Sequence, residues 1–362
     1  MKRRLEALLR DALNGAVAAG ELPGGDSPSI KFETPIDPSF GDFGSDLALQ
    51  LARSLRRPPQ PIAERLLARL RAPHGWLGAV EVAGPGFINL RLAPGFWRDL
   101  LAEAVAAGAA YGLAPQHGRR AHVELLQEVG CSPPGLAEAR AAMVADATAQ
   151  LLRAAGDVVD CPRVAAAIPG GARLGVRVAR GREAVREIPV GPVQASLDGA
   201  PRHATLRMLL DEVGADAARF FLLLGRPHAP LELDLGLARR ERTDNPLFYA
   251  RYAQARLAAV LRSTVDEGTR PDLGWLGAAE DPLVRLLVSY PDVVDAAADH
   301  LEPQRILRYA LDLAAAWHHY YNRSGILAEH PALARARLAL VRCVQQVLRS
   351  AFGVVGCAPE RP

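Results

Sequence analysis

The sequence contains very little lysine, since only Lys2 and Lys31 occur among its 43 basic residues. Nearly every cation is therefore a guanidinium group, which favours planar, bidentate and stacking contacts over point-charge contacts. A GC-rich genome raises arginine and alanine at the expense of lysine, and we regard this as the main cause of the bias. The formal net charge is only +3, so binding of a polyanion must depend on local basic patches and not on a general positive field.

Cysteine is also scarce, with four residues at positions 131, 161, 343 and 357. They form no Cys-x-x-Cys pair and have no histidine at zinc-ligand spacing, so we expect free thiols in a reducing compartment and no metal site. Apolar runs such as 220–224 are far shorter than the roughly 20 residues that a membrane-spanning helix needs. Charged residues interrupt the first helix, which argues against a signal peptide. We therefore expect a cytoplasmic protein with no membrane partner.

The most informative stretch is 245–256, Asn-Pro-Leu-Phe-Tyr-Ala-Arg-Tyr-Ala-Gln-Ala-Arg. Pro246 favours a helix start, and Tyr249, Tyr252 and Arg256 then fall at i, i+3 and i+7 along one helical face. Two phenol rings and a guanidinium suit unpaired bases, because aromatic planes stack on any base and arginine contacts phosphates and base edges. From spacing alone, a helix core with satisfied hydroxyl groups is the commoner explanation of such tyrosines.

This stretch resembles the anticodon-binding helix of arginyl-tRNA synthetases, which has an Asn-Pro or similar start followed by Tyr-x-x-Tyr-Ala-x-Ala-Arg. Residues 206–222 resemble the segment that enters this domain, and 317–322 and 339–361 resemble the family's last two helices and tail. The resemblance implies anticodon binding by Asn245, Tyr249, Tyr252, Arg256, Trp317 and Tyr321.

Residues 38–52 and 80–92 resemble the additional N-terminal domain of the same family, which holds the D-loop corner of the tRNA. The second segment alternates around a Gly-Pro-Gly turn and is typical of two short strands. The resemblance implies that Phe87 stacks on a D-loop base, that Asn89 hydrogen-bonds to it and that Gly84 permits close approach. The alternative is a buried phenylalanine and a turn-capping asparagine.

The middle of the chain departs from the family's catalytic signatures. An ungapped alignment places 135–138, Gly-Leu-Ala-Glu, on the His-x-Gly-His positions and 195–199, Ala-Ser-Leu-Asp-Gly, on the Lys-Met-Ser-Lys-like loop. The imidazoles and lysines that stabilise adenylation are missing, and an added carboxylate repels a triphosphate. Residues 157–204 are also too short to complete a doubly wound sheet. We therefore expect no enzyme, lost nucleotide binding and no cofactor.

The expected fold class follows from periodicity and this resemblance. Residues 1–118 form an α+β domain, 119–204 a reduced Rossmann-like remnant or linker, and 205–362 an all-α anticodon-binding bundle. Helices are expected near 2–19, 45–56, 61–71, 95–109, 136–155, 206–224, 246–264, 281–298, 303–323 and 332–355. Strands are expected near 30–33, 78–83, 87–92, 121–126, 173–178 and 187–193.

Three further groups of polar residues have competing explanations. His318 and His319 are adjacent in a helix, so their side chains point about 100° apart and cannot share one metal ion. The run 239–242, Arg-Arg-Glu-Arg, can contact anticodon-stem phosphates or form a solvated, internally paired cluster. The five arginines between 173 and 186 can touch the acceptor arm, but a structural role is the more common one.

The sequence therefore predicts a non-catalytic, pseudoenzyme form of arginyl-tRNA synthetase that recognises arginine tRNA through the anticodon loop and the D-loop. It resembles the DALR-type anticodon-binding proteins of high-GC bacteria, and we expect an adaptor, carrier or sensor. One alternative is a protein-interaction module that has lost RNA binding. Another is a regulatory subunit of a true synthetase or of a tRNA-modifying enzyme.

Overall fold

The computed structural model describes residues 1–25, 28–126, 135–160, 163–164, 174–263, 271–324, 326 and 330–357. The chain forms two compact units, Met1–Glu103 and Ala104–Pro362. The division falls inside helix α4 (Pro94–Ala107). None of the described helices is long and apolar enough to cross a membrane.

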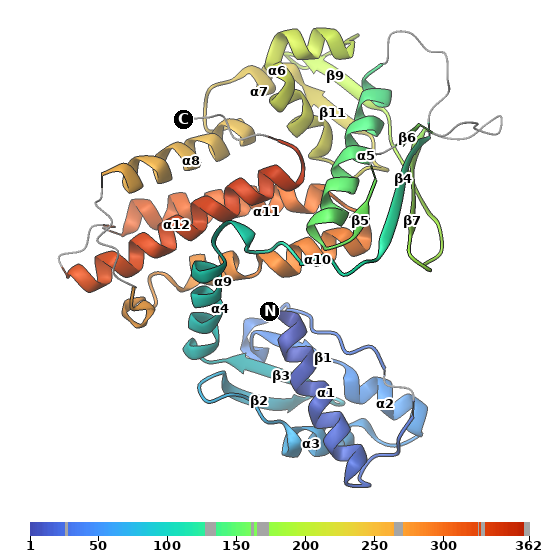
Figure 1. Cartoon of the computed structure of the whole chain (residues 1–362), viewed down its shortest axis with the longest axis vertical. Coiled ribbons are helices and arrows are strands. Elements are labelled where there is room, and N and C mark those ends of the chain that lie inside the picture. The colour runs from blue at the N-terminus through green and yellow to red at the C-terminus, as the bar shows by residue number, and fades with distance from the viewer. Residues whose placement is uncertain are drawn as a thin grey trace. The chain divides into compact units, whose positions relative to one another are not determined.

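The first unit is a three-stranded antiparallel sheet covered by helices (Figure 1). The strand order is β1-β3-β2, and the strands are β1 (Phe43–Ser45), β2 (Leu77–Ala83) and β3 (Phe87–Leu92). Helices α1 (Lys2–Ala18), α2 (Leu47–Leu55) and α3 (Pro59–Arg69) pack together, and α2 and α3 lie against β3. A short 3-10 turn, η1 (Pro38–Phe40), precedes β1.

Two local patterns explain this unit. Leu5, Leu9 and Leu13 recur every fourth residue of α1 and are buried, so one stripe of the helix faces the core. The β2–β3 hairpin turns through Gly84 and Gly86, which have positive φ values of 51° and 134°. A Cβ at Gly86 would lie 3.1 Å from the backbone carbon of Pro59, so this turn needs glycine.

In the second unit, the end of α4 is followed by the 3-10 turn η2 (Gly108–Ala110) and a five-stranded mixed sheet around β4 (Arg120–Leu126). Helix α5 (Leu136–Ala154) links β4 to the parallel strand β5 (Val158–Val159), and β6 (Arg163–Val164) also pairs with β4. On its other edge, β4 pairs with the antiparallel strand β7 (Gly175–Arg180), which pairs with β8 (Arg186–Pro189). One parallel crossover is what a reduced Rossmann-like remnant would retain, but it does not by itself identify that fold.

A small second sheet has the order β10-β9-β11, with β9 (Val193–Leu197), β10 (Ala200–Arg202) and β11 (Leu231–Asp234). Helix α6 (Leu206–Leu223) lies between β10 and β11 in sequence, and α7 (Leu235–Arg239) follows β11. Gly214 interrupts α6 with φ 79° and ψ 167°. Strand β11 falls within 205–362, which the sequence predicted to be all helical, so the bundle is not purely α in this range.

The helical bundle consists of α8 (Pro246–Arg262), α9 (Asp281–Val288), α10 (Tyr290–His300), α11 (Gln304–Arg323) and α12 (Pro331–Val354). A 3-10 turn, η3 (Leu273–Trp275), precedes α9. Helices α8, α11 and α12 pack against one another, and Figure 1 shows α11 and α12 side by side. The single helix predicted over 281–298 is two helices, because Pro291 begins a new one.

Arg140 joins α5 to the segments around it. The side chain is fully buried and donates hydrogen bonds to four carbonyl oxygens, of Leu222 (3.2 Å), Gly191 (3.1 Å), Ala229 (2.8 Å) and Arg226 (2.8 Å). Burial lowers the pKa of Arg140 to about 10, so the guanidinium remains charged at neutral pH. This one side chain therefore holds α5, the end of α6 and the loop before β11 together.

Candidate nucleic-acid interface

Asn245 organises the start of α8. Its Oδ1 accepts hydrogen bonds from the backbone amides of Leu247 (3.0 Å) and Phe248 (3.3 Å), which caps the helix. Its Nδ2 donates to the carbonyl oxygens of Ala238 (3.2 Å) and Arg240 (2.8 Å). The residue is only 4% exposed. The structure thus engages its amide in local bonds, so Asn245 orients the helix that carries Tyr249, Tyr252 and Arg256.

The exposed ring of Tyr252 has two other rings beside it. Phe248, one turn earlier on α8, is nearly parallel to it, with ring centroids 6.4 Å apart and planes inclined by 8°. His318, on α11, stacks on it with centroids 5.2 Å apart. Tyr252 remains 41% exposed. The arrangement fixes the orientation of an aromatic ring that still faces solvent.

Arg256 completes the cluster from the next turn of α8. Its guanidinium carbon lies 4.9 Å from the ring centroid of Tyr252 and 4.4 Å from that of Tyr321. Its Nη1 also donates to Oδ1 of Asn322 at 3.1 Å. The guanidinium is thus held against two tyrosines, an arrangement in which an arginine presents its remaining N–H donors in a defined plane.

His318 and Trp317 lie beneath these side chains. His318 Nε2 is 3.3 Å from the carbonyl oxygen of Tyr249, and the two rings have centroids 4.5 Å apart. Burial lowers the pKa of His318, the hydrogen bond to the Tyr249 carbonyl oxygen partly opposes this shift, and the charge of Arg256 lowers the pKa further. Trp317 has no exposed surface and packs on Tyr321 at 5.5 Å. Trp317 therefore supports the cluster and does not present its own ring to a ligand.

The structure brings together four of the six predicted anticodon residues in one partly exposed cluster, namely Tyr249, Tyr252, Arg256 and Tyr321. We call these four the aromatic–arginine cluster. Sequence reasoning had not singled out Phe248 and Asn322, which contact it. Phe248 was detectable because it precedes Tyr252 by four residues on the same helix. Asn322 was not, because its partner lies 66 residues away.

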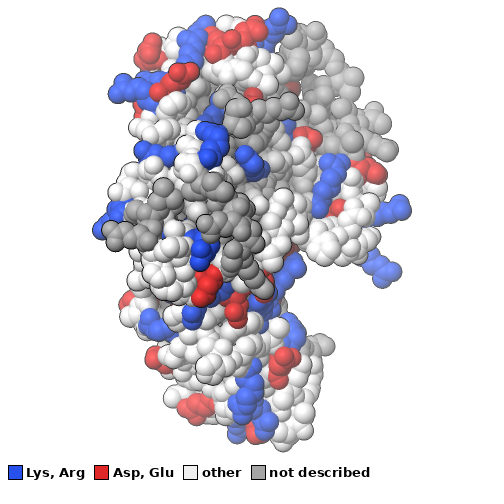
Figure 2. Space-filling view, turned by 60° about the vertical axis from the view of Figure 1, so that its left-hand side comes forward, with Lys and Arg blue, Asp and Glu red and all other residues white. Residues whose placement is uncertain are grey.

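The neighbouring arginines 239 and 240 are paired within the chain. Arg239 Nη2 lies 2.6 Å from Glu212 Oε2, and Arg240 Nη1 lies 3.0 Å from Asp244 Oδ2. Figure 2 likewise shows basic and acidic side chains interspersed over the face that it presents. Affinity for RNA at this site must therefore come from specific stacking and hydrogen bonds more than from a broad positive surface.

The predicted D-loop residues lie on the β2–β3 hairpin of the first unit. Phe87 is 42% exposed, whereas Asn89 is 8% exposed and pairs across the sheet with Gly44 and Glu81. Residues two apart in a strand share a face, so Phe87 and Asn89 point to the same side of the sheet. Gly84, in the turn, has no atom within 4 Å of the position that a Cβ would occupy. The hairpin therefore combines an exposed ring, a nearby amide and an open turn.

The arginines of the middle sheet make internal contacts. Arg177 pairs with Glu187 at 2.8 Å and Glu124 at 3.5 Å. Arg186 donates from Nη1 to the carbonyl oxygen of Asp299 at 2.6 Å. Arg173, which was part of the same predicted basic stretch, lies outside the described residues, and Arg182 is exposed. These pairings favour the structural explanation for this stretch.

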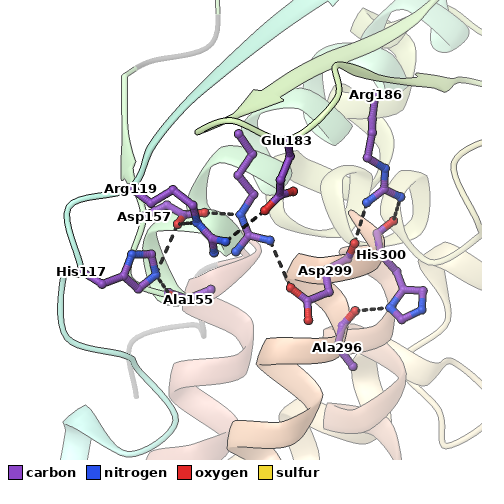
Figure 3. Close-up of polar contacts among 10 residues, drawn as sticks. His117, Arg119, Ala155, Asp157, Glu183, Arg186, Ala296, Asp299 and His300 are labelled. Carbon is purple, nitrogen blue, oxygen red and sulfur yellow. Dashed lines mark hydrogen bonds and ion pairs between the residues drawn. The ribbon is translucent and has the colours of Figure 1, made fainter. Parts of the chain in front are cut away.

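Asp157 is the centre of a buried ion network (Figure 3). Its carboxylate, 1% exposed, accepts from Arg119 Nε and Arg180 Nε, each at 2.6 Å. Arg180 Nη1 continues to Asp299 Oδ1 at 3.1 Å, and His117 Nε2 lies 3.3 Å from Asp157. The network connects β7 and the residues just before β4 and β5 to α10, and it leaves these cations little freedom to bind RNA.

No group of three or more histidine, cysteine, aspartate or glutamate side chains converges on a possible metal position in the described part of the chain. Cys343 and Cys357 are buried, and burial raises the pKa of each thiol to about 12. Neither is therefore a thiolate at neutral pH. Cys131 and Cys161 lie outside the described residues.

Two family descriptions match the chain. The arginyl tRNA synthetase N terminal domain matches residues 3–92, and the DALR anticodon binding domain matches residues 250–361. The arginine–tRNA ligase of Syntrophotalea carbinolica is 27% identical over 553 aligned positions that include 100% of both chains. The ligase of Desulfitobacterium hafniense is 40% identical over 186 residues, which cover 49% of this chain and 33% of that protein.

Solved structures show a similar fold. The arginyl-tRNA synthetase of Thermus thermophilus superimposes with a TM-score of 0.74 at 16% identity and covers 99% of both chains. A putative arginyl-tRNA synthetase from Campylobacter jejuni gives a TM-score of 0.59 at 15% identity, covering 73% of this chain and 98% of that one.

These relatives contradict the sequence prediction that the protein is not an enzyme. Proteins aligned over the whole chain carry the name arginine–tRNA ligase, and the fold matches that of a synthetase, so the comparisons point to an enzyme. The prediction depended on an ungapped register through 127–134, which lie outside the described residues. The prediction also relied on the two sequence signatures aligned with 135–138 and 195–199. An active site is defined instead by how side chains are arranged in space. The predicted loss of nucleotide binding is likewise unsupported.

The N-terminal domain match precedes the DALR match along the chain. In these two domains, in its full-length alignment and in its fold, the chain is similar to arginyl-tRNA synthetases.

Proposed function

We propose that this protein binds tRNA, and arginine tRNA in preference to others, through the aromatic–arginine cluster and the β2–β3 hairpin. The observation that carries the proposal is the ring of Tyr252, which is 41% exposed although it is stacked on His318 and contacted by Arg256. An exposed ring held by its neighbours loses little conformational freedom when a base stacks on it.

The cluster offers two kinds of contact to an unpaired anticodon base. The rings of Tyr249, Tyr252 and Tyr321 provide stacking surfaces, which tolerate any base. Arg256 provides N–H donors in a plane fixed by two rings and by Asn322, which suits hydrogen bonding to a base edge or phosphate. We therefore assign selectivity between bases to Arg256. We assign most of the affinity that comes from stacking to the tyrosines.

The hairpin provides the second contact in this proposal. Phe87 offers a stacking surface, and Asn89, on the same side of the sheet, offers an amide that can both donate to and accept from a base edge. The names of the relatives, arginine–tRNA ligases, indicate arginine tRNA as the RNA to test first.

The test compares the binding of purified arginine tRNA with that of a tRNA for another amino acid over a series of salt concentrations. Tighter binding of arginine tRNA, weakening as salt rises because counterions are released, supports the proposal. Equal binding of both tRNAs contradicts the proposed preference for arginine tRNA but leaves tRNA binding in place. Absence of binding at low salt contradicts tRNA binding and favours a protein partner.

Matched aromatic variants localise the two contacts. Tyr252→Ala is compared with Trp275→Ala, which removes another exposed ring (45%) of the second unit. Phe87→Ala is compared with Phe40→Ala, which removes another exposed ring (50%) of the first unit. We expect Tyr252→Ala and Phe87→Ala to weaken tRNA binding by roughly tenfold or more, and the two control variants to leave it unchanged. Equal losses within either pair would contradict the assignment for that unit.

A further inference from the structure

A pocket of about 790 Å³ lies beside α8, between α6, α7 and α12. Its α8 lining includes Arg251, Ala255 and Ala258. Successive residues of a helix are rotated by about 100°, so these three lie on the side of α8 opposite to Tyr249 and Arg256. The pocket therefore lies mainly on another side of α8 and adjoins the aromatic–arginine cluster at Tyr252, which also lines it. Its volume is in the range of small-molecule sites.

The pocket contains hydrogen-bond donors that lack an acceptor. Gln254 Nε2 is buried and has no hydrogen-bond partner within the described residues. The guanidinium of Arg349, from α12, has no carboxylate within ion-pair distance in that same part of the chain. A buried amide without an acceptor is destabilising, and buried polar groups normally have partners. The buried amide of Gln254 therefore favours a ligand that brings an acceptor atom, and the exposed guanidinium of Arg349 is a second donor that such a ligand can reach.

The pocket is lined by more basic than acidic side chains, namely Arg239, Arg240, Arg251, Arg349, Glu212 and Glu241. Arg239 forms an ion pair with Glu212, whose carboxylate also lies 3.2 Å from the guanidinium of Arg202. Arg240 forms an ion pair with Asp244. Added positive charge beside a solvent-open cavity attracts anions. The ligand class is therefore anionic, with neutral acceptor atoms that reach Gln254.

An aromatic surface borders the same cavity. Phe248 and Tyr252 both line it, and their rings are nearly parallel. An aromatic ring at the edge of a pocket is a surface on which a nucleobase can stack. A nucleotide is one ligand that combines a flat ring, carbonyl or ring-nitrogen acceptors and a phosphate.

We propose that this pocket binds a single nucleotide, with the base against Phe248 and Tyr252, a base acceptor on Gln254 Nε2 and the phosphate on Arg349. The nucleotide is either an unstacked residue of bound RNA or a free mononucleotide, since both present the same groups. The RNA source rests on the tRNA binding proposed above, whereas the mononucleotide source does not.

The test uses the full chain with two variants, Gln254→Met and Arg349→Met, and a charge-matched control, Arg262→Met. Arg262 is also an exposed arginine of the bundle but does not line the pocket. Binding of arginine tRNA and of AMP, GMP, CMP and UMP is measured, and a melting curve is recorded for each variant. Because Gln254 has no partner to lose, Gln254→Met is expected to melt no earlier than the wild type.

A loss of tRNA affinity of about fivefold or more in both pocket variants, with the control unchanged, supports an RNA nucleotide as the ligand. Saturable binding of a mononucleotide that both variants abolish supports the free nucleotide. If the wild type binds tRNA but the pocket variants bind it equally well, and no mononucleotide binds, the pocket assignment is wrong while the proposed function stands. If the wild type binds neither tRNA nor any mononucleotide, both fail. An equal loss in the control and in Arg349→Met would show general charge attraction and overturn the pocket.

Discussion

The guanidinium carbon of Arg256, on α8, lies 4.4 Å from the ring centroid of Tyr321, on α11. The contact joins two helices at the surface of the bundle, and it depends on the flat shape of the guanidinium as well as on its charge. A lysine at this position would keep the charge but would lose the stacked plane and the fork of donors.

We therefore expect Arg256→Lys to weaken the binding of arginine tRNA by roughly tenfold while the slope of log affinity against log salt stays nearly unchanged. Fluorescence anisotropy at several salt concentrations measures both quantities. Arg207→Lys is the control, because the Arg207 side chain is 85% exposed and lies outside the cluster. Wild-type affinity in Arg256→Lys would show that charge alone matters here.

Trp317 and Tyr321 should separate packing from ligand contact. Trp317 is fully buried, so Trp317→Ala should cost about 3–5 kcal/mol of folding free energy, as large-to-small core substitutions do. Tyr321 is only partly buried, so Tyr321→Ala should cost less stability and more tRNA affinity. Urea unfolding and a binding isotherm for each variant provide the comparison. A Trp317→Ala protein of wild-type stability would contradict the burial argument.

His318 should make stability depend on pH just below the ordinary histidine pKa of 6.5. Burial lowers the pKa of the folded imidazole, so the unfolded chain binds this proton more readily than the folded chain. The free energy of unfolding contributed by this group is therefore complete above 6.5 and falls as the pH decreases below it.

His318→Gln removes the titration and keeps a side-chain N–H donor. Unfolding free energies measured from pH 7.5 down to 5 should decline less steeply in this variant than in the wild type. Parallel curves for the two proteins would show that His318 does not contribute, and a steeper decline in the variant would reverse the assigned sign.

Asp157 should be far more important for stability than Asp299, although both bind Arg180. Asp157 is buried and compensates Arg180, whose side chain is 7% exposed, whereas the side chain of Asp299 is 68% exposed. Asp157→Asn should therefore cost about 3–5 kcal/mol because a buried cation loses its carboxylate. Asp299→Asn should cost at most about 1 kcal/mol, as for an exposed pair. Urea midpoints measure the difference, and equal midpoints for the two variants would contradict it.

Elements with strong local signals could be predicted from the sequence. Helices α1, α5, α8, α11 and α12 repeat apolar residues at helical spacing over several turns, and the predicted ranges agree with them to within about two residues. The Gly-Pro-Gly turn likewise predicted strands β2 and β3. In these segments, local pattern and tertiary packing require the same conformation.

Short elements could not be predicted in this way. Strand β11 has four residues and β1 has three, which is too few for alternation to be distinct from a loop. The strand predicted near 30–33 is only one isolated bridge between Glu33 and Gly44. The break between α9 and α10 was not predicted, because the apolar residues on either side of Pro291 continue the same helical spacing.

The site was predictable where it follows the helical repeat and unpredictable where it depends on contacts across the fold. Tyr249, Tyr252 and Arg256 share a helix face, so their proximity followed from spacing. The hydrogen bonds of Asn245 and the burial of Trp317 depend on neighbouring segments. Spacing could not show that these two residues face inward.

The four carbonyl bonds of Arg140 affect the order in which the second unit can form during synthesis. Two of the acceptors, on Arg226 and Ala229, are made 86 and 89 residues after the arginine itself. Until the ribosome has released them, the charged group has no complete set of partners and is more stable in water than in the core. Helix α5 therefore cannot pack into the core until these segments have been synthesised. A nascent chain that stops before Ala229 should be bound by chaperones or cleaved by proteases early.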